Sequence, residues 1–378
     1  MKKTVAVILV VFTLINSFCF SAAAVNDLNI SAKAALVMCA DTLEVVYEHN
    51  AYERLPMAST TKIMTALILA EQPNLEKTVV TTKQMVTVEG SSMGLLEGDT
   101  VSYRDLLYGM LLASGNDAAN TVAYALGGGP KGFAIIMNNK AKELGLKNTN
   151  FVTPSGLDDE NHYTTAYDLA LLTAHALKNK VFSAACSAKT ATLYYGNPPY
   201  KRSLTNHNKL LGSYDGTIGV KTGFTKKAGR CLVSAAQKDD KKIIAVTLNA
   251  PNDWQDHKTL LDYGFSNTVL FDADVLDIPD TLELITGDAD LVRIGVNKVK
   301  ICTTQTGAKK ISKNVILPKF VYGGIGAGES VGRVEYYLGN RLIKTANIYS
   351  LADVYLYNRK EGFLKRLYSA ICTLWNYS

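Results

Sequence analysis

Three short motifs with reactive side chains follow one another along this chain of 378 residues. Ser59–Lys62 reads STTK, Ser114–Asn116 reads SGN, and Lys221–Gly223 reads KTG. A serine hydroxyl becomes a strong nucleophile when a neighbouring base removes its proton, and a lysine serves as that base when burial or a second cation lowers its pKa. The order and spacing of the motifs therefore predict a serine acyl-transfer enzyme that uses lysine to move protons.

Each motif also has an ordinary structural interpretation when it stands alone. A serine before an apolar helical run usually caps the helix, as Ser59 would. KTG would be the end of a strand entering a turn, and SGN a loop between two helices. A Ser and a Lys three positions apart are expected about once by chance in a chain of this length. Ser114 follows Ser59 by 55 positions and Lys221 follows it by 162. Because this ordered set is far rarer by chance, we favour the catalytic interpretation.

The first motif supplies a nucleophile and a base. Ser59 precedes the apolar run 63–70, which reads as a helix, and Lys62 is three residues further on. Residues i and i+3 share one face of a helix, so the Lys62 amine can reach the Ser59 hydroxyl. Lys221 is the natural second cation. It arrives on a strand, where it can bind a substrate carboxylate or raise the local potential.

The other two motifs supply proton transfer and substrate binding. Ser114 offers a hydroxyl that can pass a proton to a leaving amine. Asn116 can hold both the lysine of the first motif and a substrate amide, because its side chain donates and accepts hydrogen bonds. Thr222 and Gly223 extend the substrate-binding strand. The backbone N–H groups of the nucleophile and of Phe224 would form an oxyanion hole, unless they serve only ordinary helix and strand hydrogen bonding.

The N-terminal segment predicts export. Residues 1–24 combine a basic start, an apolar run at 5–15 and small residues at 21–24, which is typical of a secretory signal peptide. The apolar run is short for a membrane span, although an uncleaved anchor is the alternative. Removing this segment lowers the formal charge from +6 to +4. That excess is too small to predict nucleic-acid binding.

Cysteine and histidine spacing predicts neither a disulfide framework nor a metal site. Five of the six cysteines follow the leader, an odd number with wide gaps and no CxxC pair. The five histidines are scattered along the chain. Structural metal sites use closely spaced Cys and His ligands. We therefore expect no metal and no cofactor.

The chain alternates between strand-rich and helix-rich stretches. A hairpin is expected at 34–47 and further strands at 219–222, 231–236 and 243–248, with helical patterns between them and a helix at 254–263. This order predicts an α+β domain, an antiparallel sheet with helices on it, over residues 25–271. Short strand-like runs separated by glycines predict a small all-β domain at 272–358.

The C-terminal segment 359–378 has a pattern of its own. Apolar and aromatic residues fall on one helical stripe, and three basic residues lie off it: Lys360, Lys365 and Arg366. A short basic amphipathic helix with aromatic residues is typical of a membrane-surface helix. We therefore expect binding to an anionic membrane surface. The alternatives are a helix packed on its own domain and a frayed tail.

Beyond the three motifs, nearly the whole mature chain resembles the low-molecular-weight penicillin-binding proteins, specifically the D-alanyl-D-alanine carboxypeptidases of the S11 peptidase type. The segments that carry the resemblance are 56–58, 91–98, 108–120, 153–170 and 206–211. It implies a catalytic domain like that of serine β-lactamases and transpeptidases, followed by a C-terminal β domain and an amphipathic anchor. It also implies removal of the terminal D-alanine from peptidoglycan stem peptides, acylation by β-lactam antibiotics, and a place at the outer face of the cytoplasmic membrane or the cell wall.

The chain departs from the family pattern at two positions. Many relatives have His after Lys-Thr-Gly, where this chain has Phe224. Many also carry an Arg, thought to recognise the substrate carboxylate, near the start of the helix expected at 254–263. Here Asp253 and Trp254 occupy that stretch. Carboxylate recognition then rests on Lys221 and Thr222, with Thr225 and Arg230 as further candidates.

Two other functions compete with the carboxypeptidase. A serine β-lactamase of class A-like fold shares the motif order, but it needs a glutamate between the second and third motifs to activate water. Glu160 is the only Glu within 153–168, and this region follows the peptidase pattern instead. A non-catalytic cell-wall scaffold would have no need for the complete set of Ser, Lys and Asn side chains in the three motifs.

Overall fold

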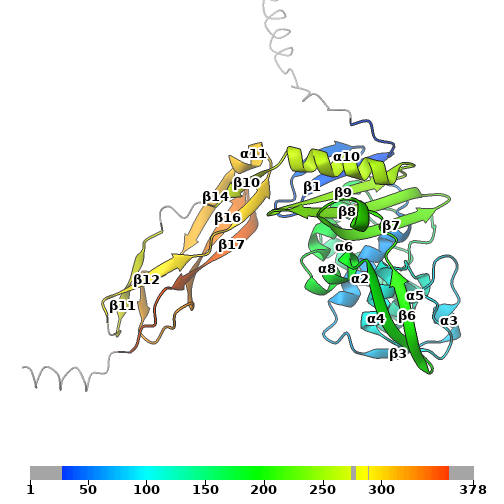
Figure 1. Ribbon diagram of the computed structural model, residues 1–378, viewed down its shortest axis with the longest axis horizontal. Coiled ribbons are helices and arrows are strands. Elements are labelled where there is room, and N and C mark those ends of the chain that lie inside the picture. Colours follow the sequence, from blue (N-terminus) through cyan, green and yellow to red (C-terminus); the bar gives the residue numbers. More distant parts are fainter. Residues whose placement is uncertain (1–27, 274–277, 288, 357–378) are drawn as a thin grey trace, which may run out of the picture. The chain divides into compact units, whose positions relative to one another are not determined.

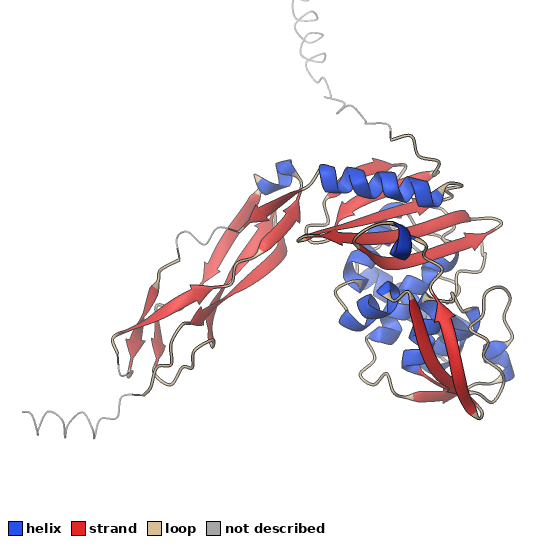
Figure 2. Ribbon diagram, viewed as in Figure 1, coloured by secondary structure: helices blue, strands red, loops and turns tan. Residues whose placement is uncertain are grey.

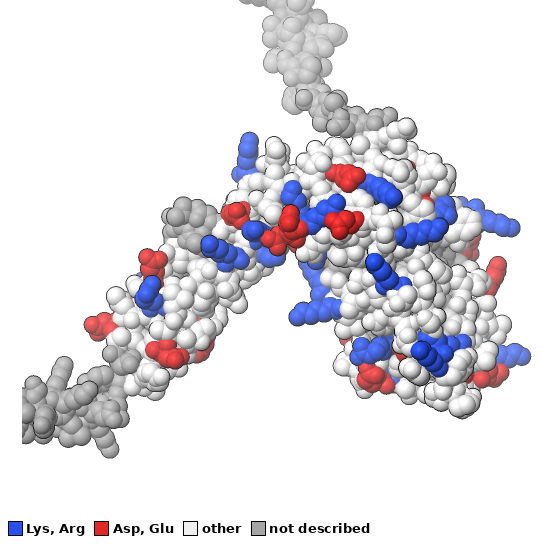
Figure 3. Space-filling model, viewed as in Figure 1, with Lys and Arg blue, Asp and Glu red and all other residues white. Residues whose placement is uncertain are grey.

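The computed structural model describes residues 28–273, 278–287 and 289–356. The described residues from Ser31 on belong to one compact unit. The predicted signal peptide at 1–24 and the predicted helix at 359–378 lie outside the described residues. Within the described ranges, no helix has both the length and the apolar character needed to cross a membrane. Figure 3 shows acidic and basic side chains interspersed over the face drawn.

A five-stranded antiparallel sheet is the centre of the catalytic domain, with strand order β2-β1-β9-β8-β7. β1 (Ala34–Cys39) pairs with β2 (Val45–His49) and with β9 (Lys241–Leu248). β8 (Gly229–Lys238) lies between β9 and β7 (Thr217–Thr225). The N-terminal hairpin therefore joins strands from some 200 positions later, as predicted. All six residues of β1 are buried, as expected for a central strand covered on both faces.

Helices cover both faces of this sheet. Figure 1 shows α10 (Asp253–Ser266) above the sheet and most of the other helices below it. Those helices are α2 (Lys62–Ala70), α4 (Tyr103–Leu111), α5 (Asn116–Gly127), α6 (Pro130–Glu143), α7 (Ala166–Ala176) and α8 (Lys180–Ser187). Local sequence sets their starts. For example, the Ser102 hydroxyl accepts a hydrogen bond from the Asp105 N–H at 3.0 Å and caps α4.

A second, four-stranded sheet was not expected from the sequence. Its order is β3-β4-β5-β6. The strands are β3 (Thr78–Val80), β4 (Thr100–Ser102), β5 (Thr190–Gly196) and β6 (Pro199–Thr205). The short helices η1 (Ala58–Thr61), α3 (Lys83–Val86) and α9 (Leu210–Ser213) complete the domain. Because β3 and β4 have only three residues each, their sequences carry too few alternations to be recognised.

The C-terminal region is built from strands, with only the short helix α11 (Gln305–Ala308) among its described residues (Figure 2). A six-stranded sheet has the order β14-β16-β17-β12-β11-β15, and β10 pairs with β13. These strands are β10 (Val269–Asp272), β11 (Thr281–Ile285), β12 (Leu291–Val296), β13 (Lys300–Thr303), β14 (Ile311–Ile316), β15 (Phe320–Tyr322), β16 (Ser330–Leu338) and β17 (Arg341–Ser350). The predicted α+β domain followed by an all-β domain is thus confirmed. The boundary at residue 272 stays a prediction.

Candidate active site

The first motif lies where a tight helical turn enters α2. Ser59 belongs to η1, and Lys62 is the first residue of α2. Ala58, just before the nucleophile, has φ +46°, a left-handed conformation that a residue with a Cβ seldom adopts. Gly156 packs against this turn, and a Cβ on it would meet the carbonyl oxygen of Ala58. The surrounding structure therefore holds the nucleophile on a strained turn, a feature that clusters at active sites.

The Lys62 amine is fully buried and has three polar partners. Its Nζ lies 2.9 Å from Ser59 Oγ, 2.6 Å from Asn116 Oδ1 and 2.8 Å from the Ser155 carbonyl oxygen. The amide oxygen and the carbonyl oxygen can only accept hydrogen bonds. A neutral amine has two N–H bonds, which these acceptors occupy, so its lone pair points at the Ser59 hydroxyl. This arrangement suits Lys62 as a general base.

Burial tunes both lysines. Burial first, and then the positive charge of Lys221, holds the pKa of Lys62 well below its ordinary value of 10.5, while the Asp117 carboxylate acts in the opposite direction. Burial also lowers the pKa of Lys221 to about 7. The lowered pKa makes the neutral form of Lys62 easier to reach than that of a lysine in water.

The second and third motifs also contact each other. Lys221 Nζ donates to Ser114 Oγ at 3.1 Å and to the Thr222 carbonyl oxygen at 2.8 Å. Ser114 lies between α4 and α5 and has φ +58°, a second strained position. A Cβ on Gly223 would lie 3.0 Å from the Ser59 backbone nitrogen, so glycine lets the Lys-Thr-Gly strand pass close to that N–H group. The structure thus brings all three predicted motifs together.

Two clefts open beside the nucleophile, and Ser59, Ser91 and Phe224 line both of them. The first has a volume of about 510 Å³, and its further lining residues are Ser114, Asn206, His207, Lys209, Thr222, Gly223, Arg230, Asp253 and Trp254. The second, of about 460 Å³, is lined by Gly90, Asn116, Ser155, Gly156, Leu157 and Thr225. A substrate reacting at the nucleophile can therefore extend in two directions. The first cleft is the basic one, with Lys209 and Arg230 in its wall.

Arg230 and Thr225 differ in their availability to a substrate. Arg230 donates from Nε to Asp253 Oδ1 at 2.9 Å, and its guanidinium lies 5.7 Å from the Trp254 ring centre. This bond uses one of the five guanidinium donors, and the side chain is 42% exposed. The Thr225 hydroxyl already donates to Asp158 at 2.8 Å. Arg230 is therefore the better placed of the two candidates for carboxylate binding.

Sequence reasoning missed several groups around the motifs. The Ser155 carbonyl holds Lys62, and the carbonyl of Glu89 accepts from Asn116 Nδ2 at 2.6 Å. Both belong to or adjoin segments that carried the family resemblance, which was the available signal. Backbone acceptors leave no residue-type signature, so their role follows only from the fold. Among the described residues, no group of three or more His, Cys, Asp or Glu side chains is arranged to hold a metal ion.

The fold and the site define a serine acyl-transfer enzyme with a lysine base. A family model described as D-alanyl-D-alanine carboxypeptidase, peptidase S11, matches residues 21–252, and one described as the C-terminal domain of penicillin-binding protein 5 matches residues 265–355. The chain belongs to the S11 family of D-alanyl-D-alanine carboxypeptidases. The predicted family is thus confirmed, and the carboxypeptidase is favoured over the β-lactamase and the scaffold.

Individual relatives agree with this assignment. D-alanyl-D-alanine carboxypeptidase DacC of Escherichia coli is 31% identical over 368 residues, which cover 91% of this chain and 88% of the relative. DacF of Bacillus subtilis is 38% identical over 249 residues, 64% of each chain. Among solved structures, penicillin-binding protein 5 of Haemophilus influenzae has a TM-score of 0.62 at 28% identity, covering 86% of this chain and 98% of that one. A Streptomyces DD-transpeptidase has a TM-score of 0.60 at 35% identity, covering 63% and 98%.

Proposed function

We propose that this protein is a serine-type carboxypeptidase that removes the terminal D-alanine from peptidoglycan stem peptides through an acyl-enzyme on Ser59. One observation carries the proposal. The buried Lys62 amine has two fixed hydrogen-bond acceptors. In its neutral form it directs its lone pair at the Ser59 hydroxyl, 2.9 Å away. A binding protein would gain nothing from burying a lysine in this way, because the burial costs free energy that only catalysis makes useful.

Acylation begins with attack of Ser59 Oγ on the penultimate D-alanine carbonyl. Lys62 takes the hydroxyl proton as the new C–O bond forms. The N–H groups of the nucleophile and of Phe224 stabilise the oxyanion. The C–N bond then breaks, and the leaving amine takes up the proton that Lys62 accepted, relayed through the Ser114 hydroxyl, which is hydrogen-bonded to Lys221. The product is an ester on the nucleophile and a free D-alanine.

Deacylation reverses these roles with water as the nucleophile. Lys62, returned to its neutral form, can accept a proton from a water molecule that attacks the ester carbonyl. The C–O bond to Ser59 breaks, and the serine oxygen regains its proton. The shortened stem peptide leaves with a new carboxylate. The site therefore needs no metal ion or cofactor for either half of the reaction.

The two clefts suggest how the substrate lies. A carboxypeptidase substrate ends in a free carboxylate, which matches the basic first cleft, where Thr222, Lys209 and Arg230 are in the wall. Lys221, with a pKa of about 7, loses its charge in mildly alkaline solution, whereas the Arg230 guanidinium stays charged. The acyl-donor part of the stem peptide then extends along the second cleft, past Asn116. β-Lactam antibiotics would acylate Ser59 through their own strained amide, and the ester would persist.

Release of D-alanine from a defined pentapeptide, together with labelling by a fluorescent penicillin, tests the function. A carboxypeptidase releases D-alanine and keeps the label. Rapid loss of the label with hydrolysis of the antibiotic would identify a β-lactamase. Absence of both label and product would leave a scaffold. The label should map to the peptide that contains Ser59, and a label elsewhere would overturn the assignment of the nucleophile.

We also propose that the enzyme acts outside the cytoplasmic membrane and that residues 359–378 bind its anionic surface. The support is the leader-like sequence at 1–24 and the apolar stripe at 363–375 beside three basic residues. Both segments lie outside the described residues. Basic side chains next to an apolar helical face favour anionic headgroups, and each contributes about 1 kcal/mol near the surface.

Deletion of residues 360–378 tests the membrane proposal. The full-length protein should sediment with anionic vesicles, and the truncated protein should stay in solution. Hydrolysis of a soluble pentapeptide should be equal in both, because the catalytic motifs end at residue 223. If the segment instead packs on its own protein, the full-length protein will not sediment and truncation will lower the melting temperature.

A further inference from the structure

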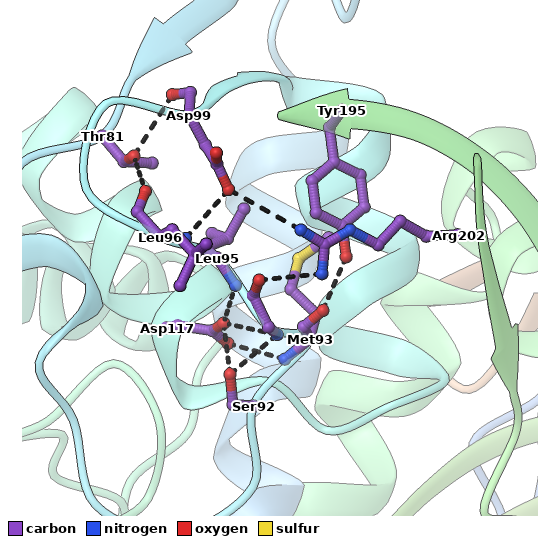
Figure 4. Close-up of polar contacts among 10 residues, drawn as sticks. Thr81, Ser92, Met93, Leu95, Leu96, Asp99, Asp117, Tyr195 and Arg202 are labelled. Atoms are coloured by element: carbon purple, nitrogen blue, oxygen red, sulfur yellow. Dashed lines mark hydrogen bonds and ion pairs between the residues drawn. The ribbon is translucent and has the colours of Figure 1, made fainter. Parts of the chain in front are cut away.

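A buried carboxylate directly follows the second motif. Asp117 is fully buried at the start of α5. Its Oδ2 accepts from the Ser92 hydroxyl at 2.6 Å, the Gly94 N–H at 3.0 Å and the Leu95 N–H at 2.9 Å. Its Oδ1 accepts from the Met93 N–H at 2.9 Å. Figure 4 shows these donors converging on one side chain. A single carboxylate thus ties down four consecutive residues, 92–95.

The adjoining segment 89–91 binds the catalytic asparagine. The Glu89 carbonyl oxygen accepts from Asn116 Nδ2 at 2.6 Å, and the Ser91 carbonyl oxygen accepts from the Asn116 backbone N–H at 2.7 Å. The first bond fixes which way the side-chain amide points, so its oxygen faces Lys62 Nζ at 2.6 Å. Gly90 and Ser91 also line the clefts beside the nucleophile. Displacement of 92–95 would therefore move an acceptor that orients Asn116.

A second clamp holds the same loop from the opposite side. Arg202 on β6 donates to the Gly94 carbonyl oxygen at 2.9 Å, and Tyr195 on β5 donates to the Met93 carbonyl oxygen at 2.6 Å. The guanidinium also contacts two aromatic rings, 4.6 Å from the centre of Tyr195 and 4.0 Å from that of Tyr200. Figure 4 shows the guanidinium and the Asp117 carboxylate on either side of the loop. This clamp carries positive charge, whereas Asp117 carries negative charge.

We propose that Asp117 is a positioning residue for acylation: its carboxylate holds residues 92–95 so that segment 89–91 orients Asn116 and, through it, Lys62. The inference rests on the function proposed above. The four-stranded sheet then has a role as well, since its β5–β6 hairpin holds residues 92–95 against Asp117. A misplacement of about 1 Å in such a network can lower a catalytic rate about a hundredfold.

Asp117→Asn tests the proposal with little change in volume. The amide group replaces one acceptor oxygen by a donor, which then faces an N–H of the loop. We expect the second-order rate of penicillin acylation to fall about tenfold or more, with the loss in kcat rather than KM for D-alanine release, because Lys62 acts in the chemical step. The matched control is Asp168→Asn. Asp168 is buried at the start of α7 and accepts from the Asn148 N–H and the Thr149 hydroxyl, away from the clefts.

The pH profile separates positioning from general destabilisation. Lys62 must be neutral to accept a proton, so the acylation rate rises with pH through its pKa. The charges that face Lys62 are Lys221 on β7 and Asp117 on α5. Because the Asp117 charge raises the pKa of Lys62, Asp117→Asn should shift the ascending limb to lower pH. Arg202→Met releases the loop from the other side and keeps that charge, so it should slow acylation without this shift.

The outcomes distinguish this inference from the proposed function. If the wild-type protein is not acylated at all, the proposed function fails. If the wild-type protein is acylated and Asp117→Asn has the same rate and pH profile, only the positioning role is overturned. An equal loss in Asp168→Asn would also overturn it, because any weakened helix start would then suffice. If Asp117→Asn does not fold, Arg202→Met decides: unchanged acylation would contradict the proposal.

Discussion

The catalytic domain and the C-terminal β domain bury different kinds of side chain. The catalytic interior encloses the charged or polar side chains of Lys62, Lys221, Asn116 and Asp117, each at most 5% exposed. Among the described residues from 278 on, the buried polar side chains are Thr303 and Ser350, with no charged side chain buried. Burying a charge costs free energy unless hydrogen bonds and opposite charges compensate it. The difference places the chemistry in the first domain and leaves the second with an apolar core.

The two domains should also respond differently to mutation. In the first domain, the side chains near the nucleophile form one hydrogen-bonded network, so a change at one position alters the protonation or orientation of the next. In the second, the core residues contribute mainly by volume and apolar area. We therefore expect large catalytic effects with small stability effects in the first case, and the reverse in the second.

The largest effect is expected for Ser59→Ala. Removal of the hydroxyl eliminates the proposed nucleophile, so covalent labelling by penicillin should disappear while the melting temperature stays near that of the wild type. Ser213→Ala, on an exposed turn of α9, is the matched control and should label normally. Intact-mass measurement after incubation with the antibiotic detects the covalent adduct in each variant. A covalent adduct that survives in Ser59→Ala would refute the assignment.

Lys62→Ala should come next in size. General-base assistance typically contributes about 10²–10⁴-fold to a rate, so acylation should slow by that factor. The variant also removes an amine whose burial costs free energy, so the protein should still fold. Lys83→Ala, on the exposed surface of α3, serves as the control. Stopped-flow acylation gives the rates, and a loss below about tenfold would mean that another group is the base.

Trp254→Arg tests the substrate side of the site. A new guanidinium in the first cleft could form a charge-assisted hydrogen bond with the substrate carboxylate, worth about 1.5–3 kcal/mol. The specificity constant kcat/KM for a D-Ala-D-Ala substrate should then rise roughly ten- to a hundredfold. Trp254→Gln removes the indole without adding charge and separates the two effects. No change, or a fall, would show that Arg230 and Lys221 already hold the carboxylate.

The smallest catalytic effect is expected in the β domain. Ile348 on β17 is fully buried in its apolar core, so Ile348→Ala should cost about 2–5 kcal/mol of that domain's stability. The acylation rate should stay unchanged. Ile316→Ala on β14, where the side chain is 37% exposed, should cost far less. Denaturant unfolding and penicillin labelling would be measured on the same samples. A slower acylation in Ile348→Ala would show that the core of the β domain also affects catalysis.

The sequence by itself determined the reaction class and most of the elements. The motifs name the side chains that the chemistry needs, and longer periodic segments such as those of α4 and β8 follow from local pattern. The sequence also predicted the order of strands, helices and strands and the all-β character of the second domain. It did so because hydrophobic periodicity and turn residues are local properties of a chain.

Tertiary structure alone decided how the site works. The fold places the Ser155 carbonyl on Lys62, 93 positions away, and the Glu89 carbonyl on Asn116. It also opposes the charges of Lys221 and Asp117 around one buried amine. Backbone carbonyls look alike in every sequence, and a pKa depends on burial and on neighbours that are distant along the chain. These long-range contacts exist only once the chain has folded, which is why no local pattern could reveal them.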